Sequence, residues 1–214
     1  LLTQSNREYD TAKQVSSVAR QFNRRWRLTE TYGCTGWDFN FEGHKALGDW
    51  QAALGINLRC QHLSWYTMEG EAKRDYPASI HYQSPWAPHY RKVEDYFARI
   101  NAAMDHGHEV RDVLVLHPIE TIWGLDPRDS EALDGQITAM QALRDALLTA
   151  NIDFDYGNEE ILARHGAVAD SRLQVAEADY AAVIVPSVAT LRASTLDLLR
   201  RFAEAGGQVV FLAP

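Results

Sequence analysis

The spacing of apolar residues predicts alternating helices and strands along the first half of the chain. Residues 11–23 repeat apolar positions every three or four residues, which is the period of one helix face. Shorter apolar runs have the length of strands, and Gly55 stands where a glycine commonly ends a helix. The predicted order is helix 11–23, strand 26–31, helix 43–54, strand 56–63, a long irregular aromatic segment 64–88, and helix 90–104.

Beyond residue 108 the pattern continues with shorter and more uniformly apolar strands. Uninterrupted apolar strands that alternate with helices are typical of a parallel, doubly wound sheet. Ser194 or Thr195 is the expected N-cap of the last helix. The predicted strands are 110–117, 152–156, 180–186 and 208–213, and the predicted helices are 135–150 and 194–205.

A polar stretch at residues 105–109 separates these two patterns and predicts two domains, 1–107 and 108–214. The chain begins without Met and stops in or just after an apolar strand. We therefore expect it to be a segment of a longer protein, with its second domain incomplete. A stand-alone doubly wound enzyme is the alternative, but it leaves these two ends unexplained.

The composition is that of an ordinary globular protein, and it argues against nucleic-acid and membrane partners. Of the 214 residues, 46% are hydrophobic and 23% are charged, and the net charge is −8. A surface that binds nucleic acid needs a basic stripe, so we expect no nucleic-acid partner. No apolar run approaches the length of a membrane span, so we expect no membrane partner. The two cysteines, Cys34 and Cys60, are expected to be reduced and half-buried.

Glu30 is the first candidate for chemistry. It stands at the end of a predicted strand and is followed by a turn rich in Gly, Cys, Thr and Trp at residues 33–38. Barrel glycosidases present a catalytic acid, base or nucleophile in this way, on a strand end beside aromatic residues. The alternative is a structural glutamate that caps a loop or pairs with Arg24, Arg25 or Arg27.

A glycosidase needs a second carboxyl group across the scissile bond. No acidic residue of this chain stands out as the partner of Glu30. Asp38 is too near in sequence to be assumed opposite it, and Glu42 belongs to the following helix. Glu69 and Glu71, in the aromatic segment, stay open as candidates.

His62 closes the next predicted strand, where it would bind a sugar hydroxyl, orient a carboxylate, or serve only as a structural residue. Trp37, Trp65, Tyr66 and Trp86 are candidates for stacking on the apolar face of a sugar ring. Their alternative role is to pack the loops together. For the set as a whole, we expect at least one contact with a ligand.

Other familiar sites find no support in the sequence. His44, His81 and His89 form no metal-binding spacing with neighbouring carboxylates, so no metal site is predicted. Phosphate-binding loops and the serine-hydrolase elbow are absent. In the second half His117 ends a strand as a possible site residue. An amidotransferase would need a later cysteine, however, and none follows Cys60.

Several segments of the first domain resemble large multidomain glycoside hydrolases of the α-L-rhamnosidase family 106 type. The resemblance is strong over residues 26–90 and holds only at the level of the fold beyond residue 110. The segments that carry it are Glu-Thr-Tyr-Gly-Cys-Thr-Gly-Trp-Asp (30–38), Gly-Asp-Trp-Gln (48–51), Leu-Gly-Ile-Asn (54–57), Gln-His-Leu-Ser-Trp-Tyr (61–66) and Lys-Arg-Asp-Tyr-Pro-Ala-Ser (73–79).

This resemblance implies an α/β fold made of the last strands and helices of a (β/α)8 barrel. Residues 26–30 would be the seventh strand, 56–62 the eighth, and 90–104 the closing helix. The second half resembles the flavodoxin-like, amidotransferase-like domain that follows the barrel in several glycosidase families, including family 42 β-galactosidases. In those enzymes it mediates assembly, which implies a possible homo-oligomer. A partial barrel leaves its inner face bare, so this segment alone is expected to be inactive and poorly soluble.

The resemblance also implies a function, the cleavage of a glycosidic bond with Glu30 as one of two catalytic carboxylates. Glu30 would be the general base in an inverting enzyme, as in family 106, or the nucleophile in a retaining one, as in family 42. The other carboxylate would lie outside this chain. Family 106 uses calcium, but its ligands match no residues here. The expected partner is a glycoside or saccharide, in a compartment that the sequence leaves open. The alternative is a non-catalytic carbohydrate-binding or assembly protein.

Overall fold

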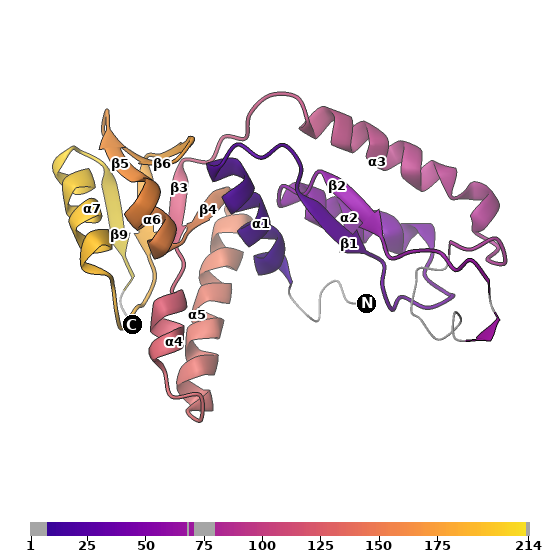
Figure 1. Cartoon of the computed structure of the whole chain (residues 1–214), viewed down its shortest axis with the longest axis horizontal. Coiled ribbons are helices and arrows are strands. Elements are labelled where there is room, and N and C mark those ends of the chain that lie inside the picture. Colours follow the sequence, from indigo (N-terminus) through magenta and orange to yellow (C-terminus); the bar gives the residue numbers. More distant parts are fainter. Residues whose placement is uncertain (1–7, 68, 71–79, 213–214) are drawn as a thin grey trace. The chain divides into compact units, whose positions relative to one another are not determined.

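The computed structural model describes residues 8–67, 69–70 and 80–212. It is a mixed α/β structure with parallel sheets (Figure 1). The chain divides into two compact units. The first unit comprises the described residues of Leu1–Ser16 and Arg25–His108, and the second comprises those of Ser17–Arg24 and Glu109–Pro214. None of the helices among the described residues is long and apolar enough to cross a membrane.

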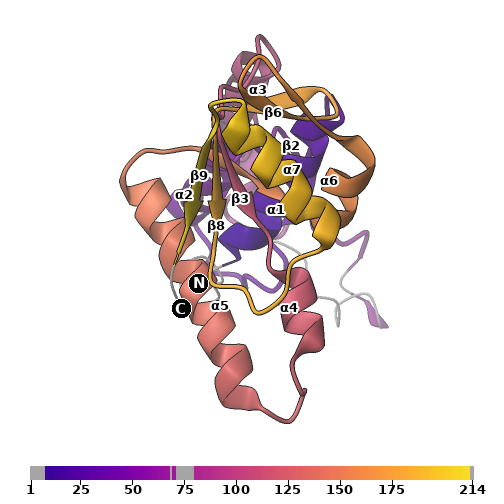
Figure 2. The same cartoon turned by 90° about the vertical axis from the view of Figure 1, so that its left-hand side faces the viewer.

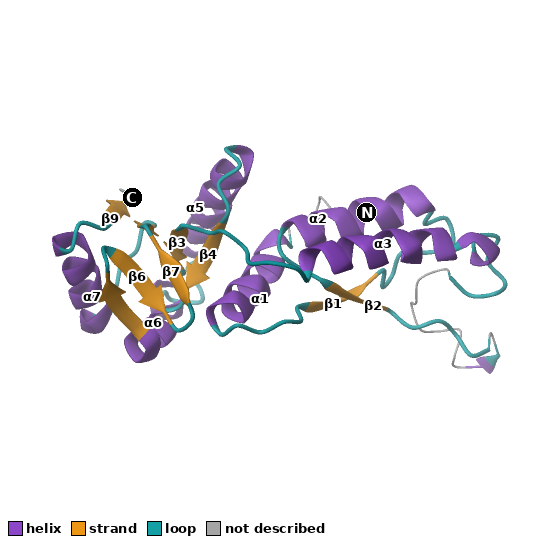
Figure 3. Ribbon diagram, turned by 90° about the horizontal axis from the view of Figure 1, so that it is seen from above, coloured by secondary structure: helices purple, strands orange, loops and turns teal. Residues whose placement is uncertain are grey.

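The first unit is built on two parallel strands with helices packed beside them (Figure 3). Its elements are β1 (Leu28–Thr31), α2 (Phe41–Ala53), β2 (Leu58–Gln61), the short 3-10 helix η2 (Ala87–His89) and α3 (Arg91–Met104), together with the first part of α1 (Tyr9–Gln21). The strand register pairs Glu30 with Cys60. As predicted, a glycine follows α2, and Gly55 takes a positive φ of 101°.

Helices α2 and α3 pack closely because a glycine lies at their contact. A Cβ atom at Gly48 would come within 2.1 Å of the Phe97 ring, which is only 1% exposed. On the side of α2 toward α1, Tyr9 meets Trp50 edge to face, with their ring centroids 5.0 Å apart. The helical layer is therefore fixed by shape as well as by apolar burial.

The second unit is a doubly wound sheet with an added antiparallel sheet. The parallel strands lie in the order β4-β3-β8-β9, and β5-β6-β7 form the antiparallel sheet. The elements are β3 (Val113–Leu116), α4 (Ile119–Gly124), α5 (Ser130–Thr149), β4 (Phe154–Gly157), α6 (Glu159–His165), β5 (Gly166–Ala169), β6 (Arg172–Val175), β7 (Ala178–Tyr180), β8 (Ala182–Val185), α7 (Ala193–Glu204) and β9 (Gln208–Phe211).

Two apolar clusters cover the two faces of the parallel sheet. Leu114 and Val183 face the cluster that includes Phe202 of α7. Val115 and Phe154 face the other cluster, which α5 covers. Figure 2 shows α5 and α7 on either side of the strands β3, β8 and β9. Because both faces are covered, the central strands β3 and β8 are apolar throughout, as the sequence pattern predicted, whereas β4 contains Asp155.

A buried polar cluster joins the last turns of α1 to this second unit. Asp155 is fully buried and accepts hydrogen bonds from Arg111 at 2.6 Å, Arg20 at 2.7 Å and the Tyr180 hydroxyl at 2.8 Å. Gln21 donates to the Tyr156 carbonyl at 3.0 Å. Burial is the main reason that the pKa of Tyr180 is raised well above its ordinary value.

Several details of the sequence prediction for the second unit are wrong. The run 180–186 is not one strand, because Tyr180 ends antiparallel β7 and β8 begins at Ala182. The N-cap of α7 is Arg192, not Ser194 or Thr195. Helix α5 begins at Ser130 instead of residue 135. Helices α4 and α6 and the antiparallel sheet were not predicted at all.

Candidate functional site

Alternation along β2 shows which way its side chains point. Arg59 and Gln61 both contact Glu94 of α3, at 3.2 Å and 2.6 Å, so they face the helices. Cys60 lies between them and therefore points to the opposite face. Its register partner Glu30 is exposed on that same face. The side of the sheet away from α3 thus carries the candidate carboxylate.

Glu30 makes none of the ion pairs that its structural alternative required. Among the described residues, its carboxylate has no hydrogen bond or ion pair. Arg25 instead pairs with Asp105, with a contact of 2.8 Å between Nε and Oδ1. Arg27 is largely buried and its guanidinium contacts the Gly55 carbonyl at 3.4 Å. A carboxylate held free at a strand end is available to a ligand.

The turn after β1 brings His62 beside this strand end. The His62 backbone N–H donates to the Thr31 carbonyl at 2.7 Å, which extends the parallel ladder by one residue. A Cβ atom at Gly33 would lie 3.3 Å from the His62 ring. Tyr32 and Cys34, on either side of Gly33, both have positive φ angles, 68° and 58°. Such strained backbone is commonly found at functional sites, where packing enforces it.

Buried contacts anchor Tyr32 and so hold the strained turn. Its hydroxyl accepts from Arg59 at 2.7 Å and donates to the His44 carbonyl at 3.2 Å. The His44 ring lies 4.5 Å from the Tyr32 ring and is fully buried. Burial is the main cause that lowers the pKa of His44. This support is aromatic and buried, and the Arg59 guanidinium also lies over the Phe97 ring, 3.9 Å from its centroid.

The loops that follow β1 and β2 meet through their aromatic side chains. Trp37 and Trp65 have ring centroids 5.2 Å apart. Trp86 donates its indole N–H to the Trp37 carbonyl at 3.4 Å. His81 packs 6.0 Å from Trp65 and 4.1 Å from Tyr82. Both loops leave the carboxyl edge of the sheet, the edge at which Glu30 stands.

The structure therefore brings some of the predicted site residues together and separates another. Glu30 and His62 lie on neighbouring strand ends, and Trp37, Trp65 and Trp86 form one aromatic group. Tyr66 is 99% exposed and is not among these ring contacts. The segment 73–79, which carried part of the family resemblance, lies outside the described residues, as does Glu71.

Neither cysteine is half-buried as expected, since Cys34 and Cys60 are both free and exposed. Asp38 is exposed in the loop after β1, and Glu42 is exposed in the first turn of α2. Within the described part of the chain, no group of three His, Cys, Asp or Glu residues could hold a metal ion.

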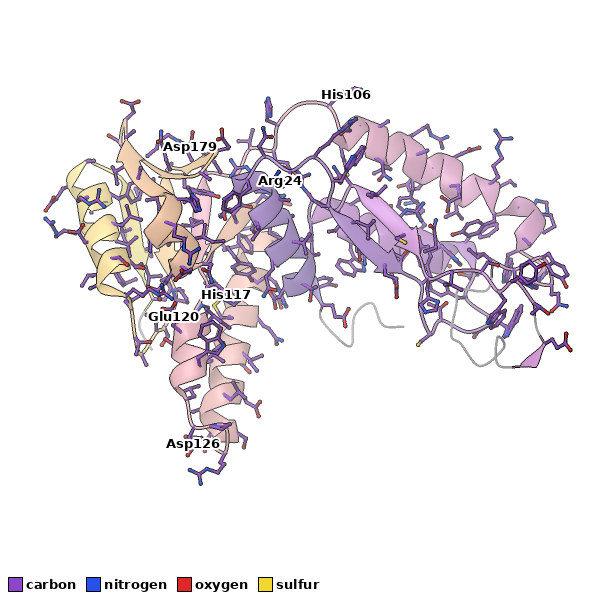
Figure 4. All side chains as sticks on the ribbon, in the orientation of Figure 1. Arg24, His106, His117, Glu120, Asp126 and Asp179 are labelled. Carbon is purple, nitrogen blue, oxygen red and sulfur yellow. The ribbon has the colours of Figure 1, made fainter. Side chains whose placement is uncertain are left out.

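In the second unit, the carboxyl edge of the sheet is closed by the chain itself. Thr121 of α4 accepts hydrogen bonds from the backbone N–H groups of Ala189 and Thr190, at 3.1 and 3.3 Å. Arg192 donates to Glu120 at 2.6 Å. Figure 4 labels Glu120 and His117 near this edge. Doubly wound folds bind ligands in this crevice, and here these contacts bridge it.

Sequence reasoning missed the residues that support the site. Arg59 and Glu94, which join β2 to α3, were not predicted as site residues. Tyr32 was recognised only as part of the motif at residues 30–38. His81 was considered only as a metal ligand. One available signal was Arg59 itself, because a charge inside a predicted strand needs a partner when it is buried.

Comparison with known proteins shows that the fold of this chain is similar to part of a solved glycosidase structure. No protein-family model and no curated protein matches the chain. Its structure is similar to that of the rhamnosidase from Novosphingobium sp. PP1Y, with a TM-score of 0.66 and 20% sequence identity. The match covers 92% of this chain and 19% of that one, so the chain spans about a fifth of the rhamnosidase. At this identity the likeness establishes a glycosidase-like fold.

Proposed function

We propose that this chain contributes Glu30 as one of two catalytic carboxylates to a glycoside hydrolase of the α-L-rhamnosidase type. The observation that carries the proposal is the exposed Glu30 carboxylate at a parallel strand end, without an ion pair among the described residues and beside His62 of the next strand. In a (β/α)8 barrel this edge is where catalytic residues lie. The fold likeness to a rhamnosidase supports the same assignment.

In this proposal β1 and β2 are the seventh and eighth barrel strands, and the second unit is an amidotransferase-like domain that serves assembly. Glu30 either activates a water molecule or attacks the anomeric carbon itself. A second carboxylic acid, not assigned here, protonates the leaving oxygen. His62 binds a sugar hydroxyl, and Trp37 with Trp65 supplies an apolar wall for the sugar ring.

The test is Glu30→Gln in the protein that carries this sequence, produced in full length. With p-nitrophenyl α-L-rhamnoside, kcat is expected to fall by about 10²-fold or more, because the base or nucleophile is lost. Glu42→Gln is the matched control, since Glu42 is also exposed but begins α2. Retained turnover in Glu30→Gln would refute the catalytic assignment.

A non-catalytic carbohydrate-binding protein is the second candidate, and the exposed aromatic rings of the two loops favour it. It predicts that the unmodified protein binds sugar but hydrolyses no glycoside. If hydrolysis is observed, the anomer first released, followed by NMR, decides between water activation and direct attack by Glu30. Inversion indicates a general base and retention indicates a nucleophile.

A further inference from the structure

A pocket of about 210 Å³ lies between the first two turns of α2 and those of α3. Figure 3 shows these helices side by side. They touch where Gly48 meets the Phe97 ring, one turn after Lys45. Because α3 lies on the Arg59 side of β2, the pocket and Glu30 are on opposite sides of the strands. The residues that line the pocket are Phe41, Lys45, Lys92, Val93, Tyr96 and Phe97.

The interior of this pocket is apolar, and ring contacts hold its walls in place. Val93 and Phe97 form the buried floor, being 6% and 1% exposed. The Phe41 ring packs against Trp86 with centroids 5.8 Å apart. Tyr96 meets Phe97 edge to face at 4.9 Å. An apolar cavity of about 150 Å³ is enough to bind benzene, so this pocket has room for a ligand with one aromatic ring.

The free charge at the edge of the pocket is positive. Lys92 is exposed at the start of α3, and it makes no hydrogen bond or ion pair with another described residue. The two nearest carboxylates of α3 are already paired, Glu94 with Arg59 and Asp95 with Arg91. The charge of Lys92 is therefore left uncompensated beside an apolar pocket.

A second ammonium group faces the pocket from α2. Lys45 pairs with Asp49 and also lies over the Tyr96 ring, 4.8 Å from its centroid. Asp49 accepts a further hydrogen bond from the Tyr96 hydroxyl at 2.9 Å, so its charge is engaged on both sides. An ammonium group has three N–H donors, and one ion pair leaves others for a ligand. None of the described residues that line the pocket is acidic.

We infer that this pocket is a binding site for a small aromatic carboxylate. The ring lies against Phe41 and Tyr96, and the carboxylate lies beside Lys92. The volume admits one ring, the aromatic walls favour its flat faces, and the uncompensated charge selects an anion. The site is separate from the proposed catalysis, because Glu30 stands on the other side of the strands.

Benzoate is the probe, titrated into the full-length protein that carries this sequence and followed by ligand-observed NMR. A ligand of this size is expected to bind with a Kd of about 1 mM. Benzamide keeps the ring without the charge and should bind about fivefold more weakly, because a charge-assisted hydrogen bond is lost. Acetate keeps the charge without the ring and should show no saturable binding. Benzamide binding equal to that of benzoate, or saturable binding of acetate as tight as that of benzoate, would contradict the inference.

Lys92→Gln localises the binding to this pocket. It should weaken benzoate binding about fivefold, because it removes the free charge and leaves the aromatic walls in place. Arg99→Gln is the matched control, since Arg99 is an exposed cation of the same helix outside the pocket. Its Kd should stay within about twofold of the unmodified value, because a distant exposed charge is screened. No saturable binding of benzoate, or the same Kd in the two variants, overturns the inference. Neither result depends on whether any glycoside is hydrolysed.

Discussion

Replacement of Asp155 by asparagine removes the negative charge at the centre of the buried polar cluster in the second unit. Asp155 is fully buried and lies 2.6 Å from Arg111 Nη1 and 2.7 Å from Arg20 Nη1. The Tyr180 hydroxyl donates to it at 2.8 Å. Asparagine preserves the size of the side chain, so the change tests charge instead of packing.

The contacts of Asp155 set the expected loss of unfolding free energy in Asp155→Asn. Breaking a buried ion pair by removing one partner generally destabilises a protein by about 3–5 kcal/mol, because the other charge stays buried without compensation. Arg111 keeps Asp153 at 2.8 Å and Glu109 at 3.7 Å, and the Arg20 side chain is 16% exposed. We therefore expect Asp155→Asn to lower the unfolding free energy of the second unit by about 3 kcal/mol, the lower end of that range.

Hydrogen exchange is the appropriate assay, because it reports each unit separately. The protection of the β3 and β4 amides gives the opening free energy of the second unit. Asp153→Asn is the control, since Asp153 also pairs with Arg111 but its side chain is 40% exposed. An exposed partner of this kind contributes about 0–1 kcal/mol. The reasoning is wrong if Asp155→Asn lowers protection no more than Asp153→Asn does.

Two further predictions concern the first unit. Gly48→Ala should destabilise it by about 1–3 kcal/mol, because the new methyl group would overlap the Phe97 ring. Gly135→Ala is the control, in an open position of α5 of the second unit; it should stabilise the protein by about 0.5–1 kcal/mol, and urea unfolding compares the two variants. Burial lowers the pKa of His44 in the folded protein, so the unfolded chain binds the proton more readily. The unfolding free energy should therefore fall as the pH drops below about 6.5. His44→Phe should remove this contribution, which unfolding curves between about pH 5 and 8 measure. A gain in stability from Gly48→Ala, or an unchanged pH dependence in His44→Phe, would contradict these predictions.

Local patterns predicted the elements that place the candidate carboxylate. The helical spacing within 11–23 and 90–104 corresponds to α1 and α3, and the short runs around Glu30 and His62 correspond to β1 and β2. In each case the signal is local, because the spacing of apolar residues and the turn residues at the ends both lie within a short stretch of the chain.

The antiparallel sheet was missed although part of its signal was present. Leu173 and Val175 of β6 are buried and alternate with exposed Gln174, the period of a half-buried strand. Asp170 and Ser171 both take positive φ angles between β5 and β6, which is the geometry of a tight hairpin turn. The sequence Asp-Ser lacks the glycine that usually marks such a turn, so the hairpin escaped detection.

The supporting contacts of the site could not be predicted, because they are made between distant residues. Arg59 contacts Glu94, which is 35 positions away in the sequence, and Tyr32, which is 27 positions away. No periodicity within β2 or α3 specifies these partners. Only the packed structure shows that a buried arginine joins the strand, the strained turn and the helix.

These contacts decide which residues of the two strands can take part in chemistry. A slip of one residue between parallel strands would turn every side chain to the other face. Glu94 holds both Arg59 and Gln61, so β2 is fixed with these two toward α3 and Cys60 away from it. The pairing of Glu30 with Cys60 then places the carboxylate on the face without helices, while Thr31 is buried. The buried arginine and its glutamate thus determine that Glu30 is presented at the sheet edge, beside His62.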